Sequence, residues 1–347
     1  MQLQDILQRY QSRFFSQYGH RLKAEQRSAL YAMLGCRQGQ YGKLILNCQA
    51  CHQYGTVPRS CGHRACNQCQ HQSTQHWLDR QLRKQLPVDY FMTTFTLPPP
   101  LRALAKAHPR TVYNVLMQSA ATTLKRFGLN KKDFSAETGM CVVLHTHTRQ
   151  LDYHPHVHIV VPGGGVNRAR REFRKIRGQY LFNGKALAKA FRGEFLHQVE
   201  RAGLHVPATP YQWVVQCQKV GQGVQALRYL ARYLYRGVLS NQNIVSDDGT
   251  FVCFRYKESK TNKWQSRTLR GEELIHRLLQ HVLPKGFRRA RDYGFLHGNA
   301  KSLMKVIQWV FKIERPESTK QKRATYICPH CTGTMYVIGF KSARASP

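Results

Sequence analysis

The stretch HTHTRQLDYHPHVH, residues 145–158, carries five histidines within fourteen positions. The residues around its two ends have the composition of β-strands, 140–148 and 157–161, and a polar turn lies between them. Side chains on a strand alternate between its two faces, so His156 and His158 lie on the same face. The pattern therefore predicts a strand–turn–strand unit with imidazoles gathered on one side.

Two imidazoles on one face of a strand can hold a divalent ion, and a neighbouring strand can supply a third. His145 lies eleven residues before His156, across the turn, and is the candidate third ligand. His147 shares its face and is the alternative, whereas His154 precedes the strand proper. A site of His145, His156 and His158 leaves positions open for water and phosphate oxygens, which suits Mg²⁺ or Mn²⁺ acting on a phosphodiester. A lone His-x-His is more often a chance surface pair, but five histidines on a strand–turn–strand favour a metal site.

Residues 224–236 have the pattern of an amphipathic helix with one apolar stripe. The stripe consists of Leu227, Leu230, Ala231 and Leu234. Tyr229 and Tyr233 are four residues apart, so they share a face outside that stripe. Arg228 and Arg232 line an adjoining face and are candidate DNA-binding residues. The spacing alone favours a structural role in which the tyrosines pack against neighbouring residues. The predicted metal site favours a catalytic role instead.

A tyrosine hydroxyl is a weak nucleophile at neutral pH because its pKa is about 10. A metal ion that polarises the target phosphate, with arginines close by, offsets this weakness. Attack by Tyr229 or Tyr233 gives a phosphotyrosine, which conserves the energy of the phosphodiester for later rejoining. That chemistry is typical of a strand transferase, and a simple nuclease does not need it.

Two Cys-x2-Cys pairs near the start of the chain are separated by fourteen residues, a spacing close to that of paired zinc knuckles. The predicted ligands of one structural Zn²⁺ ion are Cys48, Cys51, Cys66 and Cys69, with Cys61 or His63 as alternates. A further pair, Cys328 and Cys331, supplies only half of the ligands of a zinc site. Either other residues complete this site, with His330 and the N-terminal cysteines as candidates, or the pair binds no metal. The other thiols are expected in the apolar core: Cys36, Cys141, Cys217 and Cys253.

The chain is strongly basic, with 54 Lys plus Arg against 18 Asp plus Glu and a formal net charge of +36. So large a charge repels itself unless a polyanion is nearby, and nucleic acid is the usual one. The segment 166–177 is predicted to be a basic hairpin or loop that contacts the DNA backbone, or else a solvated loop. Its candidate DNA-binding residues are Arg168, Arg170, Arg171, Arg174 and Lys175. A ribosome-associated or merely basic protein is the plainer alternative.

The sequence also bears on the compartment. No apolar run is long enough to span a membrane, and the first residues lack the basic start and apolar centre of a secretory signal. We therefore expect a cytoplasmic protein. In a reducing cytosol, closely spaced cysteines indicate metal binding rather than disulfides.

Periodic segments along the rest of the chain predict the fold. Strands are expected at 89–97, 211–220 and 251–256, and helices at 76–86, 185–201 and 272–282. Strands that alternate with helices and are joined by hairpins predict an α+β fold with a mainly antiparallel sheet. The expected parts are a helical and zinc-binding DNA-docking domain at 1–88, an endonuclease domain at 89–315, and a basic tail with a Cys-x2-Cys knuckle at 316–347.

Several motifs follow one another in a specific order, although each alone is weak. They are Cys48-x2-Cys51, Ser60-Cys61-Gly-His-Arg64-x-Cys66-x2-Cys69, Tyr90-Phe91 with Phe95-Thr-Leu-Pro98, His154-Pro-His-Val-His158, Tyr229-Leu-Ala-Arg-Tyr233 and His281-Val-Leu-Pro-Lys-Gly-Phe287. In this combination the chain resembles the two-tyrosine HUH transposases of rolling-circle insertion sequences. The resemblance extends over roughly residues 15–340.

The resemblance implies an HUH nuclease core, which is an antiparallel sheet flanked by helices, with the tyrosine helix packed across it. In that core His156 and His158 would be the HUH pair, and Tyr229 and Tyr233 the nucleophiles. The resemblance further implies a bacterial enzyme that cuts and rejoins single-stranded DNA without a nucleotide cofactor. One tyrosine nicks the element's end, keeps a 5′-phosphotyrosine and leaves a free 3′-OH. The third metal ligand varies in this group, so His145 depends on the strand geometry.

Two alternatives stay open at the level of the sequence. A replication initiator or relaxase-type nickase shares the chemistry, but the N-terminal zinc module and the order of the motifs favour a transposase. A non-catalytic, zinc-dependent nucleic-acid-binding regulator explains the charge and the cysteines, but it leaves the histidine cluster and the paired tyrosines without a use. A transposase with a carboxylate triad is disfavoured, because acidic residues are scarce.

Overall fold

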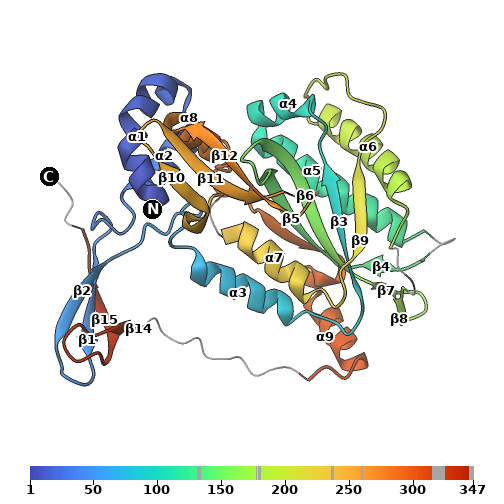
Figure 1. Ribbon diagram of the computed structural model, residues 1–347. Coiled ribbons are helices and arrows are strands. Elements are labelled where there is room, and N and C mark those ends of the chain that lie inside the picture. Colours follow the sequence, from blue (N-terminus) through green and yellow to red (C-terminus); the bar gives the residue numbers. More distant parts are fainter. Residues whose placement is uncertain are drawn as a thin grey trace. The chain divides into compact units, whose positions relative to one another are not determined.

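The computed structural model covers residues 1–130, 134–176, 178, 181–235, 238–258, 261–314 and 325–343, without the side chains of Tyr233 and Tyr235. Their contacts divide the chain into two units (Figure 1). The first unit comprises Met1–Gln72, Tyr235–Val282 and Pro316–Pro347, and the second comprises Ser73–Leu234 and Leu283–Arg315. None of the described helices is long and apolar enough to cross a membrane.

The second unit is built on a five-stranded sheet in the order β13-β5-β6-β3-β9, in which all neighbouring strands are antiparallel. The strands are β3 (Tyr90–Thr96), β5 (Met140–His147), β6 (Tyr153–Pro162), β9 (Val215–Lys219) and β13 (Ala290–Tyr293). This sheet confirms the predicted α+β fold, with β6 as its central strand. Because β6 begins at Tyr153 and not at Val157, His154 lies within the strand rather than before it.

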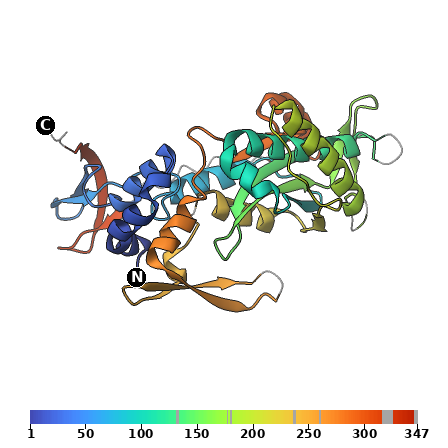
Figure 2. The ribbon, with the colours of Figure 1, turned by 90° about the horizontal axis from the view of Figure 1, so that it is seen from above.

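One face of this sheet is apolar and forms the main hydrophobic core of the unit. Phe91, Phe95, Val157 and Ile159 point into this core and are fully buried. The helices of the core layer are α4 (Leu101–Ala107), α5 (Pro109–Gly128) and α6 (Gly184–Arg201). Figures 1 and 2 show them on one side of the sheet and α7 (Val224–Tyr235) on the other side.

The remaining elements of the second unit surround this sheet. They are most of α3 (His71–Leu82), η3 (Gly294–Leu296), η4 (Gly298–Ala300), α9 (Lys301–Val310) and a small sheet of β4 (Glu137–Thr138), β7 (Gly164–Asn167) and β8 (Glu172–Lys175). The predicted basic segment 166–177 therefore forms the β7–β8 hairpin, and Arg177 at its end lies outside the described residues.

The first unit contains a helical cluster packed on a three-stranded antiparallel sheet. Its elements are α1 (Leu3–Tyr18), η1 (Gly19–Arg21), α2 (Ala24–Leu34), η2 (Asn241–Asn243), β10 (Ile244–Asp247), β11 (Phe251–Lys257), β12 (Trp264–Arg270) and α8 (Gly271–Leu279). The Tyr10 ring packs so closely on Gly271 that a Cβ there would lie 2.3 Å from the ring. The Tyr10 hydroxyl donates to Asp247 at 2.6 Å, which joins α1 to β10.

A second sheet of the first unit joins the two ends of the chain. Its order is β14 (Thr325–Ile327), β15 (Thr334–Lys341), β1 (Lys43–Cys48) and β2 (Tyr54–Pro58), and all three pairings are antiparallel. Within the segment expected as a tail at 316–347, β15 pairs with β1 and β14 pairs with β15. By their contacts, the described residues of 235–282 group with Met1–Gln72 in the first unit.

Candidate active site and metal centres

The three predicted metal-binding histidines come together on the sheet face that carries α7. His156 and His158 lie two residues apart on β6, and His145 lies opposite His156 on β5. The ring centroid of His145 is 5.2 Å from that of His156 and 4.4 Å from that of His158. The rings of His156 and His158 are 4.9 Å apart. One ring nitrogen of each residue lies within 4.8 Å of the other two, so the three nitrogens can bind a single divalent ion.

Hydrogen bonds to the Nδ1 atoms orient two of these rings. The Nδ1 atom of His156 lies 2.6 Å from the carbonyl oxygen of His154, to which it donates when protonated. The Nδ1 atom of His158 lies 2.9 Å from Oγ1 of Thr94 on β3. The carbonyl oxygen can only accept, so it fixes the tautomer of His156 and leaves the lone pair of Nε2 for a metal ion. The Thr94 hydroxyl holds the orientation of the His158 ring.

The site keeps these imidazoles neutral. Burial lowers the pKa of His156 to about 3 and that of His158 to about 4, because the charged imidazolium loses its hydration there. Burial also lowers the pKa of His145 well below its usual value, with smaller contributions from the charges of the neighbouring histidines. The neutral form is the one that coordinates metal, so all three residues are ready to act as ligands at neutral pH.

Helix α7 brings a tyrosine to this cluster. The ring centroid of Tyr229 lies 5.9 Å from that of His158 and 6.4 Å from that of His145. Tyr229 is half-buried. Tyr233 follows one turn later on the same helix, and its side chain lies outside the described residues.

The other two histidines of the quoted stretch have different surroundings. His147, the alternative ligand, is buried and lies opposite Tyr153, and it is not among the three clustered residues. The Nδ1 atom of His154 accepts a hydrogen bond of 2.9 Å from Arg102 on α4. The structure therefore brings His145, and not His147, to the pair on β6.

Two residues near the cluster were not predicted. Arg289 donates from Nε to the carbonyl oxygen of Leu144 at 2.9 Å, and its positive charge lies close enough to His145 to oppose protonation of that ring. Thr94 orients His158. Thr94 could have been found from the alternation of its strand, whereas Arg289 follows the motif that ends at Phe287 and carries no periodic signal.

The candidate DNA-binding residues lie in two places of the second unit. Arg228 and Arg232 are exposed on α7, the helix that carries Tyr229. The basic residues of the β7–β8 hairpin are held partly by local contacts. Arg168 pairs with Glu137 at 3.0 Å, and Arg174 donates to the carbonyl oxygen of Phe134 at 2.8 Å. The ammonium group of Lys175 lies 4.9 Å from the Phe311 ring centroid. Arg170 and Arg171 are exposed.

The structure divides the cysteines differently from the expected single site. One cluster consists of Cys36, Cys61, Cys66 and Cys69, and the other of Cys48, Cys51, Cys328 and Cys331. The two N-terminal Cys-x2-Cys pairs thus belong to different clusters. Cys36, expected as a core thiol, lies 3.6 Å from the sulfur of Cys66, whereas the alternate His63 is not in either cluster.

The second cluster is formed by strands from both ends of the chain. The sulfur atoms of Cys48 and Cys331 are 3.5 Å apart, and those of Cys51 and Cys328 are 3.6 Å apart. The backbone N–H of Cys51 points to the sulfur of Cys48 and lowers the pKa of that thiol to about 6. In the same way, the N–H of Cys331 lowers the pKa of Cys328. Such N–H groups stabilise thiolates, which are the form that binds zinc.

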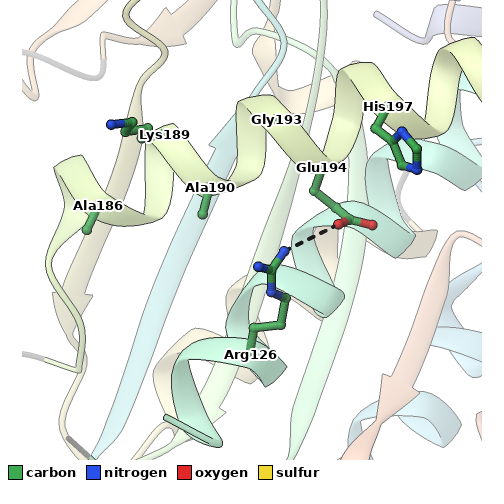
Figure 3. A pocket seen from close by; sticks show the side chains of 7 residues that line it. All are labelled: Arg126, Ala186, Lys189, Ala190, Gly193, Glu194 and His197. Carbon is green, nitrogen blue, oxygen red and sulfur yellow. Dashed lines mark ion pairs between the residues drawn. The ribbon is translucent and has the colours of Figure 1, made fainter. Parts of the chain in front are cut away.

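A pocket lies on the helical side of the second unit, away from the histidines (Figure 3). Its lining residues belong to α5 and α6, and they are Arg126, Ala186, Lys189, Ala190, Gly193, Glu194 and His197. Arg126 and Glu194 form an ion pair of 3.7 Å across it. None of the strands that carry the histidine cluster contributes to this pocket, so it is no part of the candidate active site.

An antiparallel sheet with a His-x-His pair on its central strand, and a tyrosine helix on the same face, defines a DNA-processing enzyme of the HUH class. The chain is 31% identical over 328 residues to the Sinorhizobium fredii (strain NBRC 101917 / NGR234) protein named "Putative transposase y4qJ", with 88% of this chain and 82% of that protein covered. The chain belongs to this transposase family, that of the rolling-circle HUH transposases.

Further comparisons agree with this family. Residues 139–303 match the family described as "Putative transposase", and residues 6–97 match the "Transposase zinc-binding domain". The chain is also 27% identical over 289 residues to the transposase for insertion sequence element IS801 of Pseudomonas savastanoi pv. phaseolicola, with 76% of this chain and 68% of that protein covered. The chain is accordingly a transposase with a zinc-binding domain.

Solved structures of the conjugative relaxase TrwC are similar to part of this chain. The complex of TrwC with a 27-mer DNA comprising the recognition hairpin and the cleavage site matches with a TM-score of 0.28 and 12% identity, over 65% of this chain and 75% of that chain. A metal-free complex of TrwC with oriT DNA matches with a TM-score of 0.28 and 13% identity, over 65% of this chain and 73% of that chain.

Proposed function

We propose that this transposase cuts and rejoins single-stranded DNA through a phosphotyrosine, with Tyr229 as a nucleophile beside a divalent ion held by His145, His156 and His158. The observation that carries the proposal is the nearness of the Tyr229 ring to two of the three histidine rings, at 5.9 Å and 6.4 Å. Both the nucleophile and the ligand set are thereby on one face of one sheet, where a single phosphodiester can reach them.

The donor set fits Mg²⁺ or Mn²⁺ in a site that stays partly open. Three neutral imidazole nitrogens within 4.8 Å of one another supply half of an octahedral shell, and water and phosphate oxygens complete it. When bound, the ion polarises the scissile phosphate and stabilises the charge that develops on its oxygens. Thr94 and the His154 carbonyl hold the rings in place, and the charge of Arg289 nearby adds to the positive field.

The bond changes follow from this arrangement. The hydroxyl oxygen of Tyr229 attacks the phosphorus and releases its proton to solvent, while the bond from phosphorus to the 3′ oxygen breaks. The 5′ end of the DNA stays on the tyrosine as a phosphotyrosine, and the leaving 3′ oxygen takes a proton from solvent to become a 3′-OH. Rejoining is the reverse attack by a 3′-OH on this phosphotyrosine. We assign the second nucleophile to Tyr233, for the other strand or the closing transfer.

The experiment that tests the proposal uses the full chain with labelled single-stranded DNA that carries candidate element ends. Samples with Mg²⁺, with Mn²⁺ and with a chelator are run on a denaturing protein gel. The expected result is a covalent protein–DNA band that needs the metal ion. This band should carry a label placed on the 3′ side of the cut, because that fragment keeps its 5′ phosphate on the tyrosine. Free cleaved DNA without any protein-linked band would contradict the tyrosine mechanism, and tight binding without cleavage on all ends would favour a regulator.

Replacing Thr94 by Val is expected to weaken metal binding about 10- to 100-fold, the usual effect of removing a residue that orients a metal-bound histidine. The change keeps the size of the side chain but removes the Oγ1 atom that lies 2.9 Å from Nδ1 of His158. The affinity for Mn²⁺ can be measured by electron paramagnetic resonance of free Mn²⁺. Thr93→Val is the matched control, because Thr93 is buried on the opposite face of the same strand. Equal affinities of both variants would refute a positioning role for Thr94.

Metal affinity is expected to change little between pH 7.5 and pH 5.5. Protons compete with the metal only near the pKa of each ligand, and the pKa values of His156 and His158 are lowered to about 3 and about 4. Histidines with the ordinary pKa of about 6.5 would lose about tenfold in affinity per pH unit and ligand below that value. Mn²⁺ titrations across this window decide between the two outcomes. Circular dichroism should accompany them, because lowered histidine pKa values reduce fold stability as the pH falls below about 6.5.

We further propose that each cysteine cluster binds one structural Zn²⁺ ion. Four thiolates form a closed tetrahedral shell without an open position, so the expected role is folding and not catalysis. The match of residues 6–97 to a transposase zinc-binding domain supports this role. We assign DNA-backbone contacts to Arg228 and Arg232 and to the exposed cations of the β7–β8 hairpin, because these lie in the same unit as the histidine cluster.

A further inference from the structure

The sheet of β10, β11 and β12 has one covered and one open face. On the covered face Val252 and Phe254 of β11 and Leu269 of β12 are buried, and α8 packs against both strands. Asp247 of β10 is tied to α1 through Arg9 at 2.8 Å and through Tyr10. Figure 2 shows these strands, in gold and orange, as a twisted ribbon. Because side chains alternate, the neighbouring positions must lie on the other face.

The strand register identifies the residues of the open face. The pairs that share this face are Phe251 with Arg270, Cys253 with Thr268, Arg255 with Ser266, and Lys257 with Trp264. Two large aromatic rings on it face solvent, because Trp264 is 57% exposed and Phe251 is 44% exposed. These two rings share one strand face with cations, and such a combination offers stacking surfaces to the bases of a single strand.

The charge of the open face is positive. None of the eight paired positions carries an acidic side chain. The guanidinium group of Arg255 lies 5.0 Å from the centroid of the Trp264 ring, and Lys257 is directly opposite this ring. One acid reaches this face, because Glu272 of α8 pairs with Arg270 at 2.7 Å. Two further acids lie in the turns at either end, where Asp248 accepts from the N–H groups of Thr250 and Phe251 and Glu258 accepts from Thr261.

We propose that this open face is a binding surface for single-stranded DNA, on which Trp264 and Phe251 stack with bases while Arg255 and Lys257 neutralise phosphates. Aromatic rings interleaved with cations complement a strand whose base faces are exposed, whereas the bases of a duplex are stacked on each other. Phe251 and Trp264 lie at opposite ends of the β11–β12 pairing, about 20 Å apart at the usual rise per residue. The surface therefore spans several nucleotides.

This proposal rests on the assignment of single-stranded DNA as the substrate, but it concerns a different unit from the histidine cluster. It adds a site that holds the strand rather than one that cuts it. Its failure and that of the catalytic proposal can thus be separated, because binding is measured without metal and cutting is measured at saturating DNA.

The test compares Trp264→Ala and Arg255→Ala with the wild-type full chain, using a fluorescent oligo-dT of about 20 nucleotides and anisotropy at fixed salt without divalent metal. The loss of one stacked base costs about fivefold to a hundredfold in affinity, so Trp264→Ala should raise the Kd within that range. Arg255→Ala should also lower the slope of log affinity against log salt by about 0.7, the value for one phosphate contact on a single strand. Trp264→Phe, which keeps an aromatic ring, should recover most of the affinity.

The matched control is Trp309→Ala, because Trp309 is also exposed, at 80%, but lies on α9 in the other unit. This variant should bind oligo-dT as the wild type does. Binding of oligo-dT by Trp264→Ala with unchanged affinity would overturn the proposal. A loss of affinity for duplex DNA equal to that for oligo-dT would also overturn it, since the face would then bind DNA without preference for single strands. At saturating DNA the Trp264→Ala variant should still form the covalent adduct.

Discussion

The variant His156→Ala and the double variant Tyr229→Phe with Tyr233→Phe are each expected to lose the covalent protein–DNA band. His156 supplies one of only three clustered ligand nitrogens, and the double change removes both proposed nucleophilic hydroxyl groups. Loss of the nucleophile in covalent enzymes lowers the rate on the order of 10⁴-fold or more, which puts the band below detection. Either tyrosine variant alone should give a weaker band, because one hydroxyl remains. The measurement is adduct yield per minute on the denaturing gel.

Matched controls separate catalysis from folding in this experiment. Tyr211→Phe removes the hydroxyl of a tyrosine that is 76% exposed in the same unit, and His197→Ala removes a histidine that lines the pocket of Figure 3. Both controls should form the adduct at the wild-type rate. An adduct formed by the double tyrosine variant would mean that another residue is the nucleophile. If the His156→Ala variant cuts DNA at the wild-type rate when Mn²⁺ is limiting, His156 is not a ligand of the metal ion.

Cys331→Ser is expected to reduce the zinc content of the purified chain from two ions to one and to release β15 from β1. The sulfur of Cys331 lies 3.5 Å from that of Cys48, and serine keeps the size of the side chain but binds Zn²⁺ far more weakly. A structural zinc contributes about 10 kcal/mol or more of apparent binding free energy, which is as large as the stability of a whole domain. Zinc is measured by mass spectrometry of the metal, and release of β15 by hydrogen exchange of the amides in β1.

Cys217→Ser serves as the control, because Cys217 lies on β9 of the other unit and belongs to neither cluster. This variant should keep both zinc ions and the slow amide exchange of β1. Zinc content that stays at two ions in Cys331→Ser would show that the second cluster does not use this thiol. If the wild-type chain holds only one zinc ion, the proposal of two zinc sites is wrong, and the result agrees with the single site that the cysteine spacing predicted.

The histidine site was predictable because its information is local. A strand places alternate residues on one face, so the His156 and His158 pair followed from their spacing, and a tight turn brings the preceding strand alongside. Spacing across the turn also predicted His145 as the third ligand, with His147 as the alternative, and the register, which shifts between these two residues, places His145 opposite His156. The same alternation would have found Thr94, once β3 was known to be the other neighbour of β6.

The cysteine clusters could not be derived in this way. A Cys-x2-Cys pair is a local unit, but which two pairs share an ion depends on contacts between distant segments. Cys51 and Cys328 are 277 residues apart and meet only because β15 pairs with β1. Cys36 has no partner at knuckle spacing, so it carried no metal signal. The open face of β11 and β12 was hidden for a similar reason, since only the register shows that Trp264 and Arg255 share a side.

The pairing of β1 with β15 also has a consequence for the biosynthesis of the chain. Cys48 leaves the ribosome long before Cys331, which is 283 residues further along. At a synthesis rate of about 5 to 20 residues per second, β1 waits roughly 15 to 60 s for its partner strand. In this interval the catalytic sheet, whose strands all lie between residues 90 and 293, can be completed first. Maturation of the first unit is therefore a late event, and we expect a polysome-bound chain to hold an assembled histidine cluster before the sheet of β14, β15, β1 and β2 is closed.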